Sequence, residues 1–362
     1  MPGAPVAGGS VGGSTPGPLG AGDYAVETNG LTKRFGKNVV VDAVDLRIPR
    51  GCAFGYLGPN GAGKTTLIRL LLGLLRADSG SMALLGYPVP SERATALSKV
   101  GAIVDEPRFH RHLSGMQNLR IIASAREPAA HKRIGPALER VGLTEKANER
   151  VARYSMGMRQ RLGVAACLLG DPDLLILDEP MNGLDPAGMR EMRGMILGLV
   201  DEGRTVVLSS HLLDEVQRTC HAVAIVDRGR VVRQGTIEDL LQATNVGLQI
   251  ECRPADRAHQ IVSEMLFVSG IPVVTGVQVG VDGLGITLSP QATRDHVAEM
   301  NRRLVDAGVA VYRLQPVRAS LEDWFLTVTT ALGHDGPQAP PPMPDGSPAS
   351  PNAPLSSGAS GV

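Results

Sequence analysis

The sequence predicts an α/β fold for most of the chain, on the basis of three observations. Between about Ala25 and Asn245, short apolar runs alternate with amphipathic helical patterns, as in parallel sheets covered by helices. Several of these runs are apolar at every position, which is typical of strands buried on both faces. A glycine-rich loop joins one run to a helical pattern. We expect strands, largely parallel, at residues 39–41, 52–57, 100–104, 174–177, 205–208 and 222–226.

The glycine-rich loop matches the pattern G-x-x-x-x-G-K-[ST] and reads GPNGAGKTT over residues 58–66. Glycines allow backbone N–H groups to approach a triphosphate closely. Lys64 supplies a positive charge for the β- and γ-phosphates, and Thr65 supplies a hydroxyl for Mg²⁺. The helix that follows directs its positive end toward the anion. The nucleotide-binding residues predicted in this loop are Gly58, Pro59, Asn60, Gly61, Ala62, Gly63, Lys64 and Thr65.

Composition excludes several classes of function. The 362 residues suggest about two domains, and the equal numbers of basic and acidic side chains, 36 each, give no reason to expect a nucleic-acid surface. The four cysteines are scattered without C-x-x-C spacing, which predicts reduced thiols in a cytosolic protein. No apolar run approaches the roughly 18 residues that a membrane helix needs. We therefore expect that the chain does not itself span a membrane.

The ends of the chain differ in composition from the middle. Residues 1–22 are mostly Gly, Pro, Ala and Ser, and residues 333–362 are rich in Pro and Ser, so both are predicted to be disordered. Residues 246–332 show the order β-α-β-β-α-β, with a hairpin signal at Asp282-Gly283. This order predicts a small α+β domain of the ferredoxin-like type, closed by an amphipathic helix over about 320–329.

Two further segments carry candidate chemistry. The apolar strand Leu174–Leu177 ends in Asp178 and Glu179. Beside a phosphate-binding loop, Asp178 is predicted to hold Mg²⁺ through its water shell, and Glu179 to orient or deprotonate a water that attacks the γ-phosphate. Ser155 precedes a helical pattern and is predicted to cap it, although a capping serine by itself indicates only a helix start.

Five motifs in this order resemble those of the nucleotide-binding subunit of an ATP-binding cassette (ABC) transporter, over residues 25–245. GPNGAGKTT resembles the Walker A loop, YSMGM followed by RQR the signature, and LLILDEP the Walker B strand. NGLDP at 182–186 resembles the D-loop, and SSHLLDEV contains a histidine that resembles the switch histidine. The implied fold is a P-loop NTPase cassette with the small α+β domain as an accessory.

The resemblance also implies roles for individual residues. Phe35 would stack on adenine and Thr66 would add a phosphate contact. Ser155 and Gly157 would bind the γ-phosphate of ATP held by a second copy of the chain, because such cassettes close head to tail. Asp185 would cross that interface. His211 would contact the γ-phosphate and, with Glu179, make up the catalytic pair.

The sequence departs from the family pattern in two places. Met156 and Met158 stand where the usual signature has Gly and Gln. At the Q-loop position, Asp105 and Glu106 replace a glutamine, so a neutral amide is lost and Asp105 becomes a candidate Mg²⁺ ligand. Such an acidic pair resembles that of drug- and bacteriocin-exporter ATPases. The segment PVRASLEDWF at 316–325 resembles the end of the accessory domain of antibiotic-exporter ATPases, and equally fits a generic amphipathic helix.

These observations predict a Mg²⁺-dependent ATPase subunit that dimerises and drives a separate membrane permease, most readily an exporter of drugs, antibiotics or other hydrophobic compounds. It would lie in the cytoplasm, held at the inner face of the cell membrane by its permease, and would bind no nucleic acid. Three alternatives remain open: a non-transport ABC-type ATPase, an ATP-sensing regulatory module, and an importer cassette.

Overall fold

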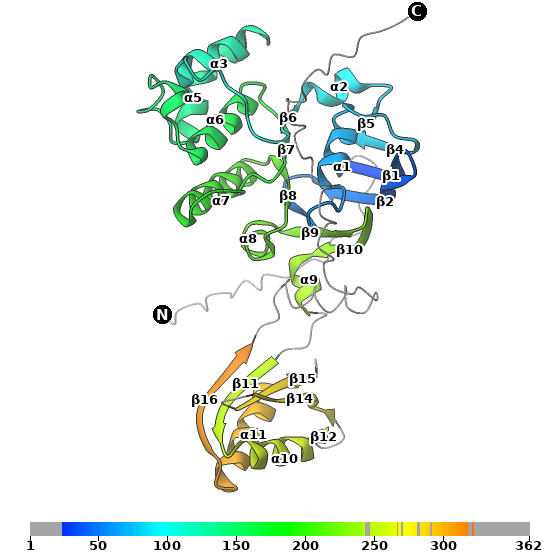
Figure 1. Ribbon diagram of the computed structural model, residues 1–362, viewed down its shortest axis with the longest axis vertical. Helices are drawn as coiled ribbons and strands as arrows, with labels where there is room; N and C mark the ends of the chain where they lie inside the picture. Colours follow the sequence, from blue (N-terminus) through cyan, green and yellow to red (C-terminus); the bar gives the residue numbers. More distant parts are fainter. Residues whose placement is uncertain are drawn as a thin grey trace, which may run out of the picture. The chain divides into compact units, whose positions relative to one another are not determined.

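The computed structural model describes residues 24–242, 247–265, 267–268, 271–280, 283–289, 292–317 and 321. Within these ranges two regions of regular structure follow one another along the chain (Figure 1). The first runs from Tyr24 to Gln242 and contains ten strands and nine helices in the described residues. The second, from Gly247 onward, contains six strands and two helices in the part that the structure describes. The predicted terminal tails and the helix over 320–329 lie outside the described residues, apart from Leu321.

A six-stranded, mainly parallel sheet forms the centre of the first region. Its strand order is β10-β9-β3-β8-β7-β6, and only the β10–β9 pair is antiparallel. The strands are β3 (Ala53–Leu57), β6 (Val100–Ile103), β7 (Leu174–Leu177), β8 (Thr205–Ser210), β9 (Ala222–Asp227) and β10 (Arg230–Thr236). Every residue of β3, β7 and β8 is buried, as predicted for strands covered on both faces.

A second sheet in this region is entirely antiparallel and was not predicted. Its order is β2-β1-β4-β5, with β1 (Tyr24–Phe35), β2 (Asn38–Pro49), β4 (Ser79–Leu84) and β5 (Tyr87–Val89). The expectation that residues 39–41 belong with the parallel strands is wrong, because they lie in β2 and pair with β1. Buried, half-buried and exposed positions are mixed along these strands, so their apolar signal is weak in the sequence.

Three helices of the first region form a group of their own. Figure 1 shows α3, α5 and α6 gathered together, and contacts join α3 and α5 to α6. The helices are α1 (Lys64–Leu71), α2 (Arg93–Ser98), α3 (Gly115–Ser124), α4 (Ala129–Lys132), α5 (Ile134–Arg140), α6 (Met156–Leu168), α7 (Pro186–Asp201), α8 (Leu213–Thr219) and α9 (Ile237–Gln242), with a 3₁₀ turn at Val151–Arg153. Ser114 begins α3 with a reciprocal capping box to Gln117.

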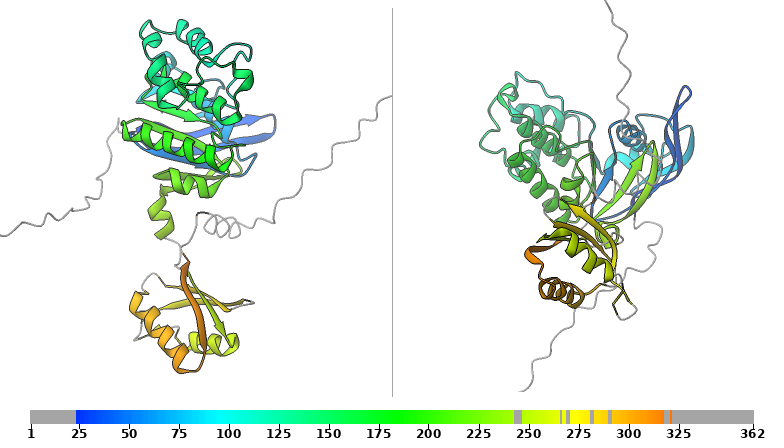
Figure 2. Two further views of the ribbon diagram at one scale, coloured as in Figure 1. Left: turned by 90° about the vertical axis from the view of Figure 1, so that its left-hand side faces the viewer. Right: turned by 60° about the horizontal axis from the view of Figure 1, so that its bottom comes forward.

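The second region is a four-stranded antiparallel sheet with two helices on one face (Figure 2). The strand order is β14-β15-β11-β16, formed by β11 (Gly247–Arg253), β14 (Val274–Gly280), β15 (Gly283–Leu288) and β16 (Ala310–Val317). The helices are α10 (Ala255–Glu264) and α11 (Arg294–Asp306), and a short pair, β12 (Phe267–Val268) and β13 (Ile271–Pro272), precedes β14. Leu248, Ile250 and Cys252 of β11 all face this region's apolar core.

Helix α1 packs between the two sheets of the first region, and its register decides which leucines are buried. Leu67, Ile68, Leu70 and Leu71 belong to a core that also contains residues of β1, β2, β3, β7 and β8. Leu74 lies just beyond the helix and is 57% exposed. The apolar face of α1 therefore holds the loop that precedes it against both sheets.

Replacing Leu70 with alanine is expected to lower the free energy of unfolding by about 2–5 kcal/mol, because it empties a fully buried site. The matched change Leu74→Ala removes the same atoms from an exposed site and should alter stability by about 0.5 kcal/mol or less. Denaturant unfolding of both variants provides the comparison. Equal losses would contradict the packing of α1.

Candidate functional site

The candidate site lies at the carboxyl-terminal edge of the parallel sheet. Strand β3 leads into the glycine-rich loop, β7 ends before Asp178, and β8 ends before His211. Because β3 and β7 both run parallel to β8, all three strands end at the same edge. This edge is where open α/β sheets bind ligands. The topology thus brings together three motifs that are far apart in the sequence.

The glycine-rich loop needs glycine at two positions for reasons visible in its backbone. At Gly63, which precedes α1, φ is +94°, and a Cβ atom would lie 2.4 Å from the carbonyl oxygen of Val40. At Gly58 a Cβ atom would lie 2.5 Å from the carbonyl oxygen of Val226. Pro59, Asn60 and Gly61 are exposed at the tip of the loop. The backbone that packs against the loop therefore leaves no room for a Cβ atom at either position.

Lys64 begins α1 and folds back over the loop. Its Nζ donates to the carbonyl oxygens of Gly58 at 2.7 Å and Pro59 at 3.2 Å. The same Nζ lies 3.1 Å from Oε1 of Glu179. The lysine side chain is only 6% exposed, and the glutamate is 22% exposed. A buried cation is therefore placed between the loop and the carboxylate that follows β7.

The carboxylate of Asp178 joins three elements. Its Oδ2 accepts a hydrogen bond from Oγ1 of Thr65 at 2.8 Å, and its Oδ1 accepts one from Oγ of Ser209 at 2.5 Å. Oγ of Ser209 also accepts from the backbone N–H of Glu179 at 2.9 Å. Asp178 is buried, and both of its oxygens are hydrogen-bonded, which offsets the cost of burying a charge.

Glu179 is held between two basic side chains. Its Oε2 lies 2.9 Å from Nδ1 of His211, while Oε1 faces Lys64. The backbone φ of Glu179 is +47°, in the left-handed region that residues other than glycine rarely adopt. Such strain, of order 1–3 kcal/mol, persists only where surrounding contacts fix it. The two basic partners and the bond to Ser209 supply those contacts.

A hollow of about 280 Å³ borders these residues, and four of its nine lining residues are acidic. It is lined by Thr65, Asp105, Glu106, Met156, Gln160, Asp178, Glu179, Asn182 and Gly183. The predicted Mg²⁺ ligands Thr65, Asp178 and Asp105 thus border one space. Ser155, Gly157, Phe35 and Asp185, which were also predicted as site residues, are not among the residues that line it.

Asp105 has a different partner from the one that the sequence suggested. Its Oδ2 lies 2.8 Å from Nη2 of Arg69 on α1, and its φ is +61°. The carboxylate is 61% exposed, so the pair contributes at most about 1 kcal/mol to stability. In the described residues no group of three or more His, Cys, Asp or Glu side chains is arranged to hold a metal. The direct metal-binding role predicted for Asp105 gains no support from these contacts.

The remaining predicted residues lie at exposed helix and strand ends. Ser155 caps α6, accepting from the N–H of Met158 at 3.2 Å, and Asp185 caps α7, accepting from Gly188 at 2.9 Å. Phe35 ends β1 and is 49% exposed, with Nζ of Lys33 5.5 Å from its ring centre. Thr66 is half-buried in the first turn of α1. Gly157 lies in the first turn of α6.

Sequence reasoning missed Ser209, which contacts both carboxylate residues of the site. A signal was present, because SS ends an apolar strand just before His211. Arg69 was also missed, since nothing in the helix sequence indicates that it pairs with a residue 36 positions away.

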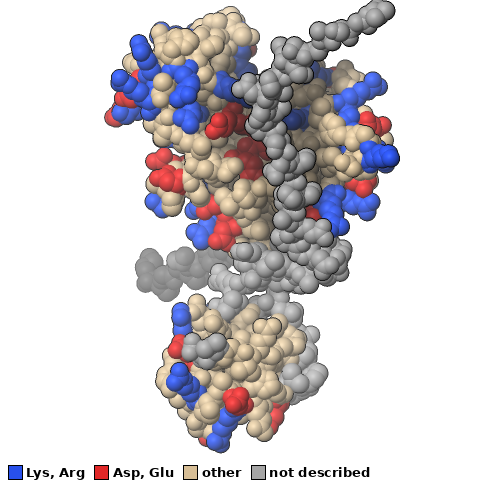
Figure 3. All heavy atoms as spheres, viewed as in Figure 1, with Lys and Arg blue, Asp and Glu red and all other residues tan. Residues whose placement is uncertain are grey.

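On the face shown in Figure 3, basic and acidic side chains are interspersed over the surface.

A strand–loop–helix with a buried lysine, beside a strand that ends in two carboxylates, defines a P-loop ATPase. The family model for ABC transporters matches residues 41–182. An ABC transporter ATP-binding protein of Bacillus subtilis (strain 168) is 38% identical over 308 residues, which are 85% of this chain and 96% of that protein. The chain belongs to the ABC transporter ATP-binding proteins and is an ATPase of that family.

Two other relatives have names that state a cargo or a resistance. The bacitracin transport ATP-binding protein of Enterococcus faecalis is 34% identical over 84% of this chain and 96% of its own length. The daunorubicin resistance ATP-binding protein DrrA3 of Streptomyces coeruleorubidus is 33% identical over 85% and 96%. Among solved structures, cbiO1 from Clostridium perfringens, part of an ABC transporter complex, matches with a TM-score of 0.56 at 27% identity, covering 60% of this chain and 90% of that one.

Removing the hydroxyl of Ser209 should leave the buried N–H of Glu179 without its acceptor and Asp178 without one donor. We expect Ser209→Ala to lower the free energy of unfolding by about 1–3 kcal/mol. Ser98→Ala is the matched control, because that hydroxyl bonds only to the carbonyl of Thr95 on an exposed helix turn. Denaturant titrations at neutral pH measure both, and a Ser209 variant as stable as the control would contradict this assignment.

Proposed function

We propose that this chain is the ATP-hydrolysing subunit of an exporter that carries drugs, antibiotics or other hydrophobic compounds through a separate membrane permease. The observation that carries the hydrolysis is the placement of Lys64, Asp178, Glu179 and His211 at one sheet edge. The export of such compounds is supported by the bacitracin and daunorubicin relatives, which align with this chain along 96% of their length.

The chain's own residues suit phosphoryl transfer from ATP to water. Lys64 would leave its backbone partners for the β- and γ-phosphates, and the N-terminus of α1 would add its dipole. Glu179 would accept a proton from the attacking water, and His211, already bonded to it, would orient the carboxylate and contact the γ-phosphate. Phe35, an exposed aromatic side chain, is suited to stack on adenine.

The residues around Asp178 fit a magnesium ion. The Thr65 hydroxyl and the Asp178 carboxylate are hard oxygen donors 2.8 Å apart, and Mg²⁺ is usually held by one or two such groups together with substrate phosphates. When bound, the ion would supply charge stabilisation at the phosphates. Ser209 would keep the Asp178 carboxylate oriented toward it.

A head-to-tail dimer with a second copy would complete the site. Ser155 and Gly157 stand at the N-terminus of α6, where exposed N–H groups favour a phosphate. Neither is among the residues that line the hollow beside Asp178. In the proposed dimer they would contact the ATP molecule held by the other copy. Asp185 would cross the same interface from the N-terminus of α7.

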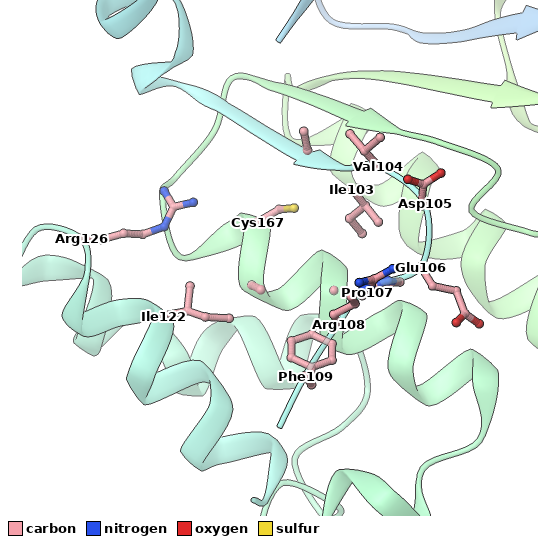
Figure 4. A pocket seen from close by; sticks show the side chains of 13 residues that line it. Ile103, Val104, Asp105, Glu106, Pro107, Arg108, Phe109, Ile122, Arg126 and Cys167 are labelled. Atoms are coloured by element: carbon pink, nitrogen blue, oxygen red, sulfur yellow. The ribbon is translucent and has the colours of Figure 1, made fainter. Parts of the chain in front are cut away.

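The permease is proposed to dock in a second hollow, of about 420 Å³ (Figure 4). Apolar side chains of Ile103, Phe109 and Ile122 contribute to its lining, and Asp105 and Glu106 line both hollows. A segment seated there would touch the residues that border the site of hydrolysis. In the described residues no helix is long and apolar enough to cross a membrane. Bound to this permease, the chain would lie at the inner face of the cell membrane.

The proposed domain division is a cassette over 25–245 and an accessory domain over 246–332, between tails 1–22 and 333–362. Separate apolar cores, one formed by residues between Ala25 and Val226 and one by residues between Leu248 and Val309, support it. The strand order β14-β15-β11-β16 with two helices on one face supports a ferredoxin-like accessory domain.

Replacing Glu179 with glutamine should leave ATP binding intact and lower turnover by a factor of about 100 or more, because the amide cannot accept the proton. Phosphate release measures turnover, and nucleotide titration measures binding. The ATP-loaded variant should also run as a dimer in light scattering. Lys64→Ala is the control that should lose ATP binding. Wild-type turnover in the glutamine variant would remove Glu179 from its proposed role.

An arginine at Ile122 should prevent recovery of the permease with the chain, because it places a charge in the apolar part of the second hollow. Ile121→Arg is the matched control, since Ile121 is 49% exposed on the same helix and does not line the hollow. A multispanning membrane protein should co-purify from detergent-solubilised membranes with the wild type and with the control. Equal recovery with both variants would exclude this docking surface.

A further inference from the structure

Gln160 on α6 is a buried polar residue that the proposed mechanism does not use. It is only 5% exposed, and it lines the acidic hollow together with Thr65, Asp178 and Glu179. Its Oε1 is buried and has no hydrogen-bond partner among the described residues. Leaving such an acceptor unsatisfied lowers the stability of the fold. A native chain tolerates that cost where the group serves another purpose.

The chemistry of the hollow explains why the amide oxygen lacks a partner. Four carboxylates line the hollow, those of Asp105, Glu106, Asp178 and Glu179. An ionised carboxylate only accepts hydrogen bonds, and an amide has one end that donates and one that accepts. An amide beside carboxylates is best placed with its NH₂ group toward them. Among the described residues the oxygen meets no donor.

The neutral amide also compensates for a feature of this chain. Position 105 holds an aspartate that pairs with Arg69, so it offers no amide donor to the hollow. Gln160 lines the same hollow and offers one. It is five residues after Ser155, which caps the same helix.

We propose that Gln160 is a positioning residue for ATP hydrolysis: in the ATP-loaded enzyme its NH₂ group donates to the carboxylates of the hollow and holds them around the attacking water. The inference rests on the proposed function of Glu179. It also implies that the unsatisfied oxygen is the cost of keeping a donor in the hollow. Stability and activity should therefore respond in opposite directions when the amide is removed.

The test is Gln160→Met, which keeps the length of the side chain and removes the amide. We expect kcat to fall about tenfold or more, the KM for ATP to change less than about twofold, and stability to stay equal or rise. Gln160→Glu keeps the shape but replaces the donors with a fifth carboxylate, so its kcat should fall at least as far. Gln249→Met, at an exposed position on β11, is the matched control and should change neither quantity.

The outcomes separate a failure of this inference from a failure of the proposed function. A Gln160→Met protein with wild-type kcat overturns the proposal, and so does one that is less stable than the wild type, because the amide would then be a structural group. A wild-type chain that fails to hydrolyse ATP would instead refute the proposed function. A wild-type enzyme that needs Glu179 and is indifferent to Gln160 would refute this inference alone.

Discussion

The carboxylate of Asp178 is the group on which the geometry of the site depends. It accepts from Thr65 of α1 and from Ser209 of β8, and it follows β7 directly. A single buried charge thus fixes the phosphate-binding helix and two strand ends relative to one another. Ser209 extends the same connection to the backbone of Glu179. Loss of either hydroxyl would leave the buried carboxylate with too few donors. Both hydrogen bonds are therefore needed to hold the three elements in place.

Glu179 gains its orientation from that junction. Its backbone, with φ in the left-handed region, directs the side chain between Lys64 and His211. Lys64 begins α1, and His211 follows β8. Both contacts are short and partly buried, so they are stronger than exposed pairs such as Arg69 with Asp105. The carboxylate beside the phosphate-binding loop is therefore confined, and the one at position 105 is comparatively free.

The sequence predicts the strands that are apolar throughout and the residues at their ends, because burial on both faces leaves a continuous pattern. It fails for the antiparallel sheet, whose strands mix buried and exposed positions and whose partners are set by contacts far along the chain, such as Val26 with Leu84. In the second region the alternation of β11 and the helical period of α11 were enough to predict both elements. Their exact ends were not predictable, since caps such as Thr293 compete with neighbouring residues.

Side-chain partners across elements were the part that the sequence could not supply. Asp105 became a candidate metal ligand because it stands at the Q-loop position, and only the position of α1 shows that Arg69 reaches it. Gln160 belongs to the RQR run of the segment that resembles the signature, and only the fold shows that its buried amide borders four carboxylates. Both cases have the same cause. A side chain on a helix meets a carboxylate in a loop that follows a strand, and the sequence does not show which helix lies beside which loop. The site of this chain therefore depends on contacts between separate elements more than on any single motif.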